Sequence, residues 1–208
     1  MSPSESSTTA LIIFAKAPVA GLAKTRLIPA LGAQGAAALA LRLLEHMVAM
    51  GLAAEFDHLE LCTTPDIHHG AFQRLAARHA LALTTQKGSD LGERMDHALT
   101  RALGTHSRVL LAGTDAPSLD TAVLREAAAA LNNFETVFVP ALDGGYVLVG
   151  LTRAASSLFN DMQWSTPQVM QATRARAVAA KLRWTELAPV ADIDEPADLV
   201  HLPSGWLP

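Results

Sequence analysis

The sequence has one cysteine and lacks the short motifs that identify common hydrolases and dinucleotide-binding enzymes. Because Cys62 is the only cysteine among 208 residues, no disulfide can form within the chain, and a reducing compartment is expected. Cys62 lies in a short apolar stretch that predicts a buried strand, so a nucleophilic role is not favoured. The eight histidines lack the spacing of zinc ligands, and neither G-x-S-x-G nor G-x-G-x-x-G occurs. A catalytic triad and a histidine metal site are therefore poorly supported.

The sequence also has no large excess of positive or negative charge, and it shows no targeting segment. The chain has 16 basic and 20 acidic residues, a net charge of −4, which argues against a nucleic-acid partner bound by bulk electrostatics. Residues 1–10 are rich in Ser and Thr and lack the regions of a signal peptide, so they predict a disordered lead-in. No apolar run approaches the roughly 20 residues that a membrane span requires. We therefore expect a soluble, cytoplasmic protein with no membrane partner.

Half of the residues are hydrophobic, which is enough for a substantial core. The length fits a single domain. We predict this domain over residues 11–202, followed by an irregular tail at 203–208. Apolar runs predict one strand that starts at residue 11 and further strands at 59–63, 80–85, 108–113, 136–140, 146–151 and 184–187. Helical spacing and start signals predict helices at 34–50, 72–80, 94–103, 120–131, 167–182 and 196–201.

The order of these segments predicts the fold class. Strands and helices alternate as far as residue 131, which is typical of a parallel sheet covered by helices on both faces. The next two strands are separated only by residues 141–145, a connection too short for a crossover helix. The sequence therefore predicts an α/β fold with three α/β/α layers and a mixed, mostly parallel sheet.

A basic loop follows the first predicted strand and contains Lys16, Gly21, Lys24 and Arg26. A strand that leads into a basic, glycine-containing loop near the N-terminus is a common phosphate site in α/β proteins. This loop is not a Walker A motif, because alanine stands directly before the Lys-Thr pair where that motif requires glycine. A solvated basic turn is the alternative interpretation.

Asp115 follows the apolar strand predicted at 108–113. In open parallel sheets, ligands bind beyond the carboxyl ends of the strands, where both Asp115 and the Lys24 loop would lie. One carboxylate there is a typical partial ligand of Mg²⁺, which retains waters and shares substrate phosphates. A helix cap is the alternative, although Ser118 or Asp120 would serve as a cap more naturally.

Two further acidic segments permit two interpretations each. Asp143 precedes Gly144 and Gly145, which is ordinary turn chemistry, but the glycines would also admit a ligand whose hydroxyls donate to the carboxylate. Asp192 and Asp194 share one face of an extended segment. They are either a solvated turn that caps the last helix or the source of a second metal ligand opposite the strand-end aspartate.

Ser165 and Thr166 stand directly before a proline, which is typical of a helix start.

Six motifs, taken in order, resemble a known bacterial family. They are Lys16-x-Pro18-x-x-Gly21-x-x-Lys24-Thr25-Arg26-Leu27, Gly88-x-x-Leu91-Gly92-Glu93-Arg94-Met95, Gly113-Thr114-Asp115-x-Pro117, Asp143-Gly144-Gly145-Tyr146, Trp164-Ser165-Thr166-Pro167 and Asp192-Ile193-Asp194. The combination is similar to GT-A-type transferases described as a domain of unknown function and as arsenosugar-biosynthesis-type glycosyltransferases. It is more distantly similar to guanylyl- and molybdopterin-cofactor nucleotidyltransferases. The resemblance spans roughly residues 11–199.

This resemblance implies a nucleotide-diphosphosugar transferase fold with Mg²⁺ or Mn²⁺ and assigns roles to individual residues. The implied phosphate- and nucleotide-binding residues are Lys16, Gly21, Lys24, Arg26, Gly88, Leu91 and Gly92. The implied substrate-binding residues are Asp143, Gly144, Gly145, Tyr146, Trp164, Ser165 and Thr166. The implied catalytic residues are Asp115, Asp143 and Lys24. Asp115 would bind the metal where many such enzymes have D-x-D; since only the last carboxylate is present here, Asp194 or Asp192 would assist.

The expected function is a Mg²⁺-dependent transfer from a nucleotide or nucleotide-sugar donor to a small-molecule acceptor. Glycosyl transfer would release a nucleoside diphosphate, whereas nucleotidyl transfer would release pyrophosphate. The basic loop has a single glycine and thus few backbone amides for a triphosphate, which favours glycosyl transfer. A nucleotide-binding protein without turnover is the alternative of another class.

Overall fold

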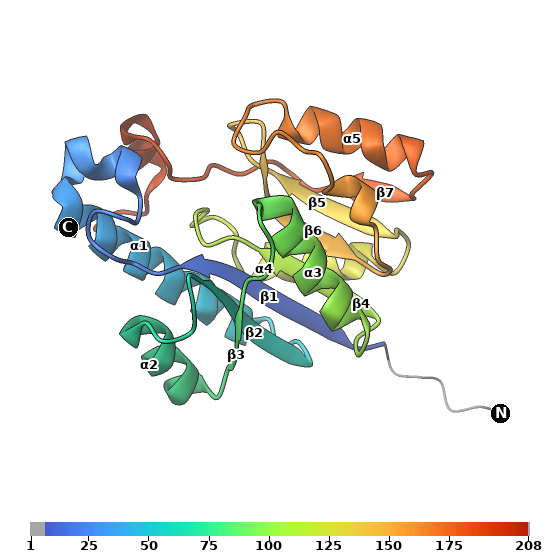
Figure 1. Ribbon diagram of the computed structural model, residues 1–208, viewed down its shortest axis with the longest axis horizontal. Coiled ribbons are helices and arrows are strands. Elements are labelled where there is room, and N and C mark those ends of the chain that lie inside the picture. Colours follow the sequence, from blue (N-terminus) through green and yellow to red (C-terminus); the bar gives the residue numbers. More distant parts are fainter. Residues whose placement is uncertain (1–6, 208) are drawn as a thin grey trace.

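A seven-stranded sheet forms the centre of the computed structural model, which describes residues 7–207 (Figure 1). Its strands are β1 (Thr9–Lys16), β2 (His58–Thr64), β3 (Ala82–Thr85), β4 (Arg108–Ala112), β5 (Thr136–Pro140), β6 (Tyr146–Leu151) and β7 (Trp184–Glu186). They follow the order β3-β2-β1-β4-β6-β5-β7, and β6 runs antiparallel to both of its neighbours while the other pairs are parallel. The antiparallel excursion expected after residue 131 is confirmed.

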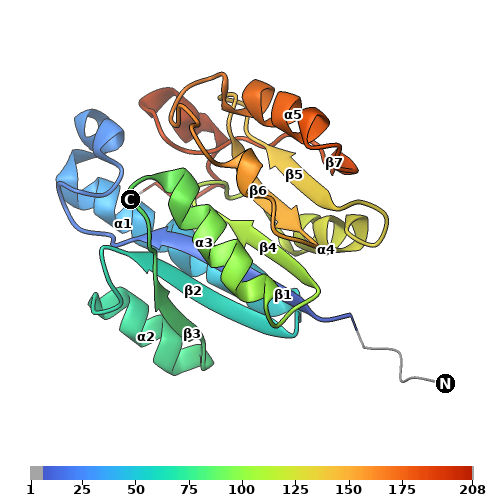
Figure 2. The same cartoon turned by 45° about the vertical axis from the view of Figure 1, so that its right-hand side comes forward.

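Helices cover both faces of the sheet. They are α1 (Ile28–Ala53), α2 (Gly70–His79), α3 (Leu91–Leu103), α4 (Thr121–Ala130) and α5 (Val169–Ala179), with short 3₁₀ helices η1 (Thr25–Leu27), η2 (Ser156–Leu158) and η3 (Pro196–His201). One buried cluster joins α1, α2 and α4 to one face, and a second joins α3, η2 and α5 to the other. Figure 2 shows α3 in front of the central strands and α4 behind them. The predicted three-layer α/β/α fold is confirmed.

The central strand β1 explains why two cores form. Leu11 and Ile13 belong to the cluster of α1, whereas Ile12 and Phe14 belong to the cluster of α3. Side chains alternate along a strand, so a strand that is apolar at every position must be covered on both faces. Burial of an aliphatic side chain of this size contributes about 1.5–3 kcal/mol, which makes β1 an anchor for both layers.

Several predicted boundaries need correction. β1 begins at Thr9, so the lead-in expected over residues 1–10 is shorter; residues 1–6 lie outside the described part of the chain. α1 begins at Ile28 instead of residue 34. Its first turn was missed because Gly32, with φ 70° and ψ 166°, is not helical and kinks the helix, so the regular spacing of apolar residues starts only after it. α5 is shorter than the predicted 167–182. Residues 203–207 contain no helix or strand.

The expectation that no apolar segment reaches the length of a membrane span is wrong for the helical region Thr25–Ala53. By length and composition alone this region is apolar enough to cross a membrane. Within the fold, however, Leu44, Met47 and Val48 of α1 are buried in the core beneath the sheet. The apolar character of these residues is thus used in packing between layers.

The beginning of α1 packs against the C-terminal segment. Figure 1 shows the blue start of α1 beside the red end of the chain. Leu27, Leu39 and Leu43 form a buried cluster with Ile193, and Trp206 packs on its border. This cluster brings the acidic segment around Ile193 next to the basic loop that precedes α1.

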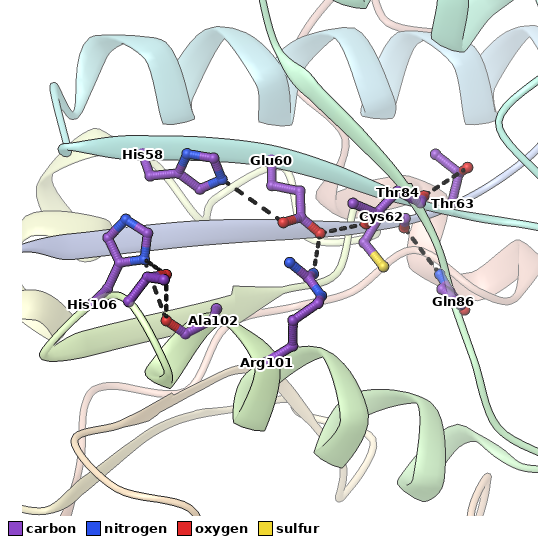
Figure 3. A network of polar contacts seen from close by, with 10 residues as sticks. His58, Glu60, Cys62, Thr63, Thr84, Gln86, Arg101, Ala102 and His106 are labelled. Carbon is purple, nitrogen blue, oxygen red and sulfur yellow. Dashed lines mark hydrogen bonds and ion pairs between the residues drawn. The ribbon is translucent and has the colours of Figure 1, made fainter.

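A polar network lies between β2 and α3 (Figure 3). Glu60 is buried and accepts hydrogen bonds from Thr84 and from Arg101, whose guanidinium is 2.5 Å away. His58 lies at the edge of the network, with its Nε2 3.8 Å from Glu60. Burial raises the pKa of the nearby Cys62 thiol to about 11, so this thiol is a poor nucleophile, as expected. Glu60 at the centre of the network is buried, whereas His58 and Arg101 are partly exposed.

Candidate active site

A cavity of about 540 Å³ lies at the carboxyl edge of the sheet. The parallel strands β1, β2, β3 and β4 all end there, and the antiparallel β6 begins there at Tyr146. The loops that follow β1 and β4, the β5–β6 turn and the C-terminal segment therefore converge on one place. The ligand crevices of open α/β sheets lie at this edge.

Most of the residues singled out in the sequence line this cavity. They are Lys16, Lys24, Arg26, Leu91, Asp115, Asp143, Gly145, Tyr146, Trp164, Ser165, Thr166, Asp192 and Asp194. The glycines Gly21, Gly88, Gly92 and Gly144 are not among the lining residues.

Two of these glycines permit close packing behind the cavity wall. A Cβ on Gly92, in the first turn of α3, would lie 2.8 Å from Trp164 Nε1. A Cβ on Gly144 would lie 2.1 Å from the carbonyl oxygen of Pro167, and Gly144 has φ +94°. Both positions therefore require glycine for close approach of another segment to the backbone.

Lys24 forms the centre of the site. Its ammonium lies 2.6 Å from Asp115 Oδ1 and 2.8 Å from Asp194 Oδ1, and it donates to the carbonyl oxygen of Ile193 at 2.6 Å. The Ile193 amide in turn donates to the backbone carbonyl of Asp115. Lys24 thus joins the loop after β1, the end of β4 and the C-terminal segment.

The backbone and the electrostatics of Lys24 are both unusual. Its φ of 47° and ψ of 46° place a residue other than glycine in the left-handed region, at a cost of roughly 1–2 kcal/mol. Burial alone lowers the pKa of the Lys24 ammonium, but Asp115 and Asp194 outweigh burial, so this pKa is raised above its ordinary value. The ammonium is therefore held in its charged form.

Two more carboxylates, those of Asp143 and Asp192, line the cavity. Burial, and then the charges of Asp143, Asp194 and Asp115, raise the pKa of Asp192 to about 6. These carboxylates therefore produce a negative potential where they converge. Asp143 also accepts a hydrogen bond from the Gly145 amide at 2.8 Å, so the turn interpretation and a place in the cavity hold together.

The capping alternatives do not account for the strand-end and C-terminal aspartates. Asp120 accepts from Val123 as the N-cap of α4, which leaves Asp115 uninvolved. The capping box of η3 is built from Glu195 and Asp198. α5 starts after Gln168 without a side-chain cap, so Ser165 and Thr166 do not cap it.

Cations line the same cavity. Lys16, Arg26 and Arg94 all line it. Arg26 is exposed and lies 3.8 Å from Glu195, while Arg94 donates to the carbonyl oxygen of Gly88 at 3.0 Å. Cations and carboxylates that line one cavity suit a ligand that carries both phosphates and hydroxyls.

Two aromatic side chains, Tyr146 and Trp164, also line the cavity. Tyr146 and Trp164 lie edge to face, with ring centroids 6.3 Å apart. Burial raises the pKa of the Tyr146 phenol, and neither its hydroxyl nor Trp164 Nε1 has a hydrogen-bond partner within residues 7–207. Both side chains therefore shape the wall and are unsuited to proton transfer.

Three residues that no sequence motif marked as functional also line the cavity, namely Gln86, Thr64 and Phe14. The Gln86 amide donates to the carbonyl oxygens of Cys62 at 3.1 Å and of Ala15 at 3.4 Å, so it bridges the ends of β1 and β2. The sequence could have indicated Gln86, because it directly follows the third parallel strand and ligands bind beyond the carboxyl ends of parallel strands.

The residues present fit a divalent cation by donor type. Carboxylate oxygens are the ligands that Mg²⁺ and Mn²⁺ prefer. Asp115 and Asp194 already share one cation, the Lys24 ammonium. No group of three His, Cys, Asp or Glu side chains is arranged as a metal site among the described residues. An ion held here would therefore complete its shell with water and ligand oxygens, as Mg²⁺ commonly does.

Comparison with protein families identifies one match. The model of a family described as "Uncharacterized protein conserved in bacteria (DUF2064)" matches residues 47–166. The matched range includes Asp115 and Asp143 and excludes the basic loop and the C-terminal aspartates. Among curated proteins, no relative of the chain was found.

Solved structures share the whole fold. A candidate nucleotide-diphospho-sugar transferase of Desulfovibrio desulfuricans G20 is 30% identical, with a TM-score of 0.85 over 93% of this chain and 85% of that one. A nucleotidyl transferase of Methanothermobacter thermautotrophicus is 15% identical, with a TM-score of 0.63 over 96% and 98% of the two chains. Rv0371c of Mycobacterium tuberculosis, in complex with manganese, is 19% identical, with a TM-score of 0.54 over 94% and 97%. The fold is that of nucleotide-diphosphosugar transferases.

Proposed function

Since the chain belongs to the DUF2064 family and has the fold of nucleotide-diphosphosugar transferases, we propose that it is a divalent-metal-dependent glycosyltransferase that acts on a nucleotide sugar. The observation that carries this proposal is the position of Asp115 and Asp194, which share a cation inside a cavity also lined by exposed basic side chains. Such a cavity suits a diphosphate bound between a metal ion and fixed cations.

The side chains of this cavity have separate roles in the proposed reaction. Asp115 and Asp194 would hold Mg²⁺ or Mn²⁺, which would neutralise the diphosphate of the donor. Lys16 and Arg26 would donate charge-assisted hydrogen bonds to phosphate oxygens, and would thereby fix the donor in place. Asp143 would accept hydrogen bonds from sugar or acceptor hydroxyls.

The backbone of the basic loop supports glycosyl over nucleotidyl transfer. The amides of Leu22 and Ala23 both donate to the carbonyl oxygen of Val19, at 3.0 and 2.9 Å. They are therefore already used within the loop and are not directed at a ligand. A triphosphate tail is commonly wrapped by free backbone amides, whereas a nucleoside diphosphate on a metal ion needs fewer of them.

The reaction class can be tested with one pair of assays. The protein is incubated with Mg²⁺ and each common nucleotide sugar, and release of nucleoside diphosphate is measured, with an Asp143→Ala variant in parallel. A second incubation contains labelled pyrophosphate and the same donors. We expect slow release of nucleoside diphosphate, with water taking the sugar in place of the acceptor, and no label in nucleoside triphosphate.

Three outcomes separate the candidate functions. Label that enters a nucleoside triphosphate would establish nucleotidyl transfer and overturn the glycosyl proposal. Nucleotide-sugar binding without turnover of any donor, detected by a thermal shift, would favour a non-catalytic nucleotide-binding protein. Release of nucleoside diphosphate that Asp143→Ala leaves unchanged would remove Asp143 from the site while the reaction class stands.

A further inference from the structure

We propose that the Lys24 ammonium occupies the cation position of the site in the free protein, and that a divalent metal ion displaces it from Asp115 and Asp194. The released ammonium then becomes available to the diphosphate of the donor. This inference rests on the proposed function, since it requires that the site take a divalent cation. It assigns to Lys24 a role in ordering the binding of metal and donor.

The hydrogen-bond donors of the Lys24 ammonium are all engaged in the free protein. An ammonium has three N–H groups. Lys24 has three acceptors within 2.8 Å, namely Asp115 Oδ1, Asp194 Oδ1 and the carbonyl oxygen of Ile193. Every donor is therefore used, so in this arrangement Lys24 has no hydrogen bond to offer a phosphate. A phosphate contact requires that the ammonium leave at least one of these oxygens.

The metal ion and the ammonium need the same oxygens. The two carboxylates that fit a divalent ion are the two that bind Lys24. An ion of charge +2 on these oxygens repels an ammonium at the same place, because unit charges a few ångströms apart in a partly buried site interact by several kcal/mol. Both cations cannot keep their full contacts at once.

The fold itself places Lys24 against these two carboxylates. Its left-handed backbone is costly for a lysine, and its side chain is buried while both aspartates remain partly open to the cavity. A metal ion can therefore approach the open side of the carboxylates while the ammonium retreats along its flexible chain. Metal binding then has to overcome the internal ion pairs, and a donor phosphate that takes up the ammonium lowers that cost.

The test is the affinity for Mn²⁺ alone, measured by calorimetry and by the paramagnetic resonance of free Mn²⁺, in wild type and in Lys24→Met. Methionine keeps an unbranched apolar chain of about the length of the lysine stem and removes the ammonium with its charge. We expect Lys24→Met to bind Mn²⁺ about tenfold more tightly, a coupling of ordinary size between two ligands of one protein. Lys24→Gln, which keeps a hydrogen-bond donor without the charge, is measured as the second variant in case methionine disturbs the loop.

The matched control is Lys16→Met. Lys16 lines the same cavity but makes no ion pair with Asp115 or Asp194. This variant removes one positive charge from the cavity but leaves the ion pairs of Lys24 with Asp115 and Asp194 in place. Because solvent and salt screen the charge of Lys16, we expect Mn²⁺ affinity to change by less than about threefold.

The outcomes separate this inference from the proposed function. If the Lys24 variants bind Mn²⁺ no more tightly than Lys16→Met, the displacement idea is wrong while a metal site still stands. If neither wild type nor any variant binds Mn²⁺, both the inference and the metal dependence of the proposed function are wrong. Tighter binding that an added Asp115→Asn change abolishes supports the exchange at these oxygens.

Discussion

Two clusters of charged side chains in this protein are built in opposite ways. In the Glu60 network the anion is inside, with a side chain 1% exposed, and its cationic partner Arg101 is 40% exposed. At the cavity the cation is inside: Lys24 is 8% exposed, whereas Asp115 and Asp194 are 44% and 41% exposed. The first cluster encloses its carboxylate, while the second presents two carboxylates to the cavity.

The difference indicates which cluster can bind a ligand. The Glu60 carboxylate is buried and already accepts hydrogen bonds from Thr84 and Arg101, as Figure 3 shows, so it is not presented to a cavity. The carboxylates of Asp115 and Asp194, which bind the Lys24 ammonium, line an open cavity at the carboxyl edge of the sheet. A buried ion pair is weak evidence for function by itself, whereas an accessible charge at the carboxyl edge of the sheet is the expected place for a ligand.

The largest expected effect is that of Asp115→Asn, which keeps the shape of the side chain and removes its charge. We expect transferase turnover to fall by about 10²–10³-fold, the size typical of the loss of one group that stabilises charge in a reaction. Because this side chain is partly solvated, the free energy of unfolding should change by less than about 1 kcal/mol. Product release and urea unfolding measure the two quantities, and an active Asp115→Asn variant would remove this residue from the site.

Arg101→Met should have the opposite signature. It leaves Glu60 buried with only Thr84 as a donor, and we expect the free energy of unfolding to fall by about 2–3 kcal/mol, at the low end for a broken buried pair because Arg101 is partly solvated. Nucleotide binding should be unchanged. Urea unfolding gives the stability.

The double variant Glu60→Met with Arg101→Met serves as the control for Arg101→Met. It should recover most of the loss, because replacement of both partners removes the unpaired charge. If Arg101→Met keeps full stability, the network contributes nothing to the fold.

Arg26→Ala should have the smallest of these effects and sharpens the contrast between two exposed arginines. Arg26 has only a loose pair with Glu195, so stability should stay within about 0.5 kcal/mol of wild type. The dissociation constant of a nucleoside diphosphate should rise by about tenfold through loss of a charge-assisted contact, and less at high salt. Calorimetry at two salt concentrations measures this, and Arg101→Met is its control; equal affinities for wild type and Arg26→Ala would place the phosphates elsewhere.

The sequence by itself was sufficient for the layers of the fold and for most of the cavity. Apolar runs such as that of β1 have no polar face, so they require cover on both sides, and this predicts three layers. Parallel strands end at one edge, so residues after them, Lys24 and Asp115 among them, could be placed together without coordinates. Alternation likewise put Asp192 and Asp194 on one face of their segment. The roles implied for these residues remain predictions.

Only the tertiary structure decided which charges meet. Lys24 and Asp194 are separated by 170 residues, and their contact depends on the cluster that docks the C-terminal segment against α1. The early start of α1 was hidden because Gly32 interrupts the periodicity, and the buried place of Glu60 was hidden because Arg101 comes from a distant helix. Local sequence fixes backbone preference and the alternation of faces, but the partner of a charge is set by packing between distant segments.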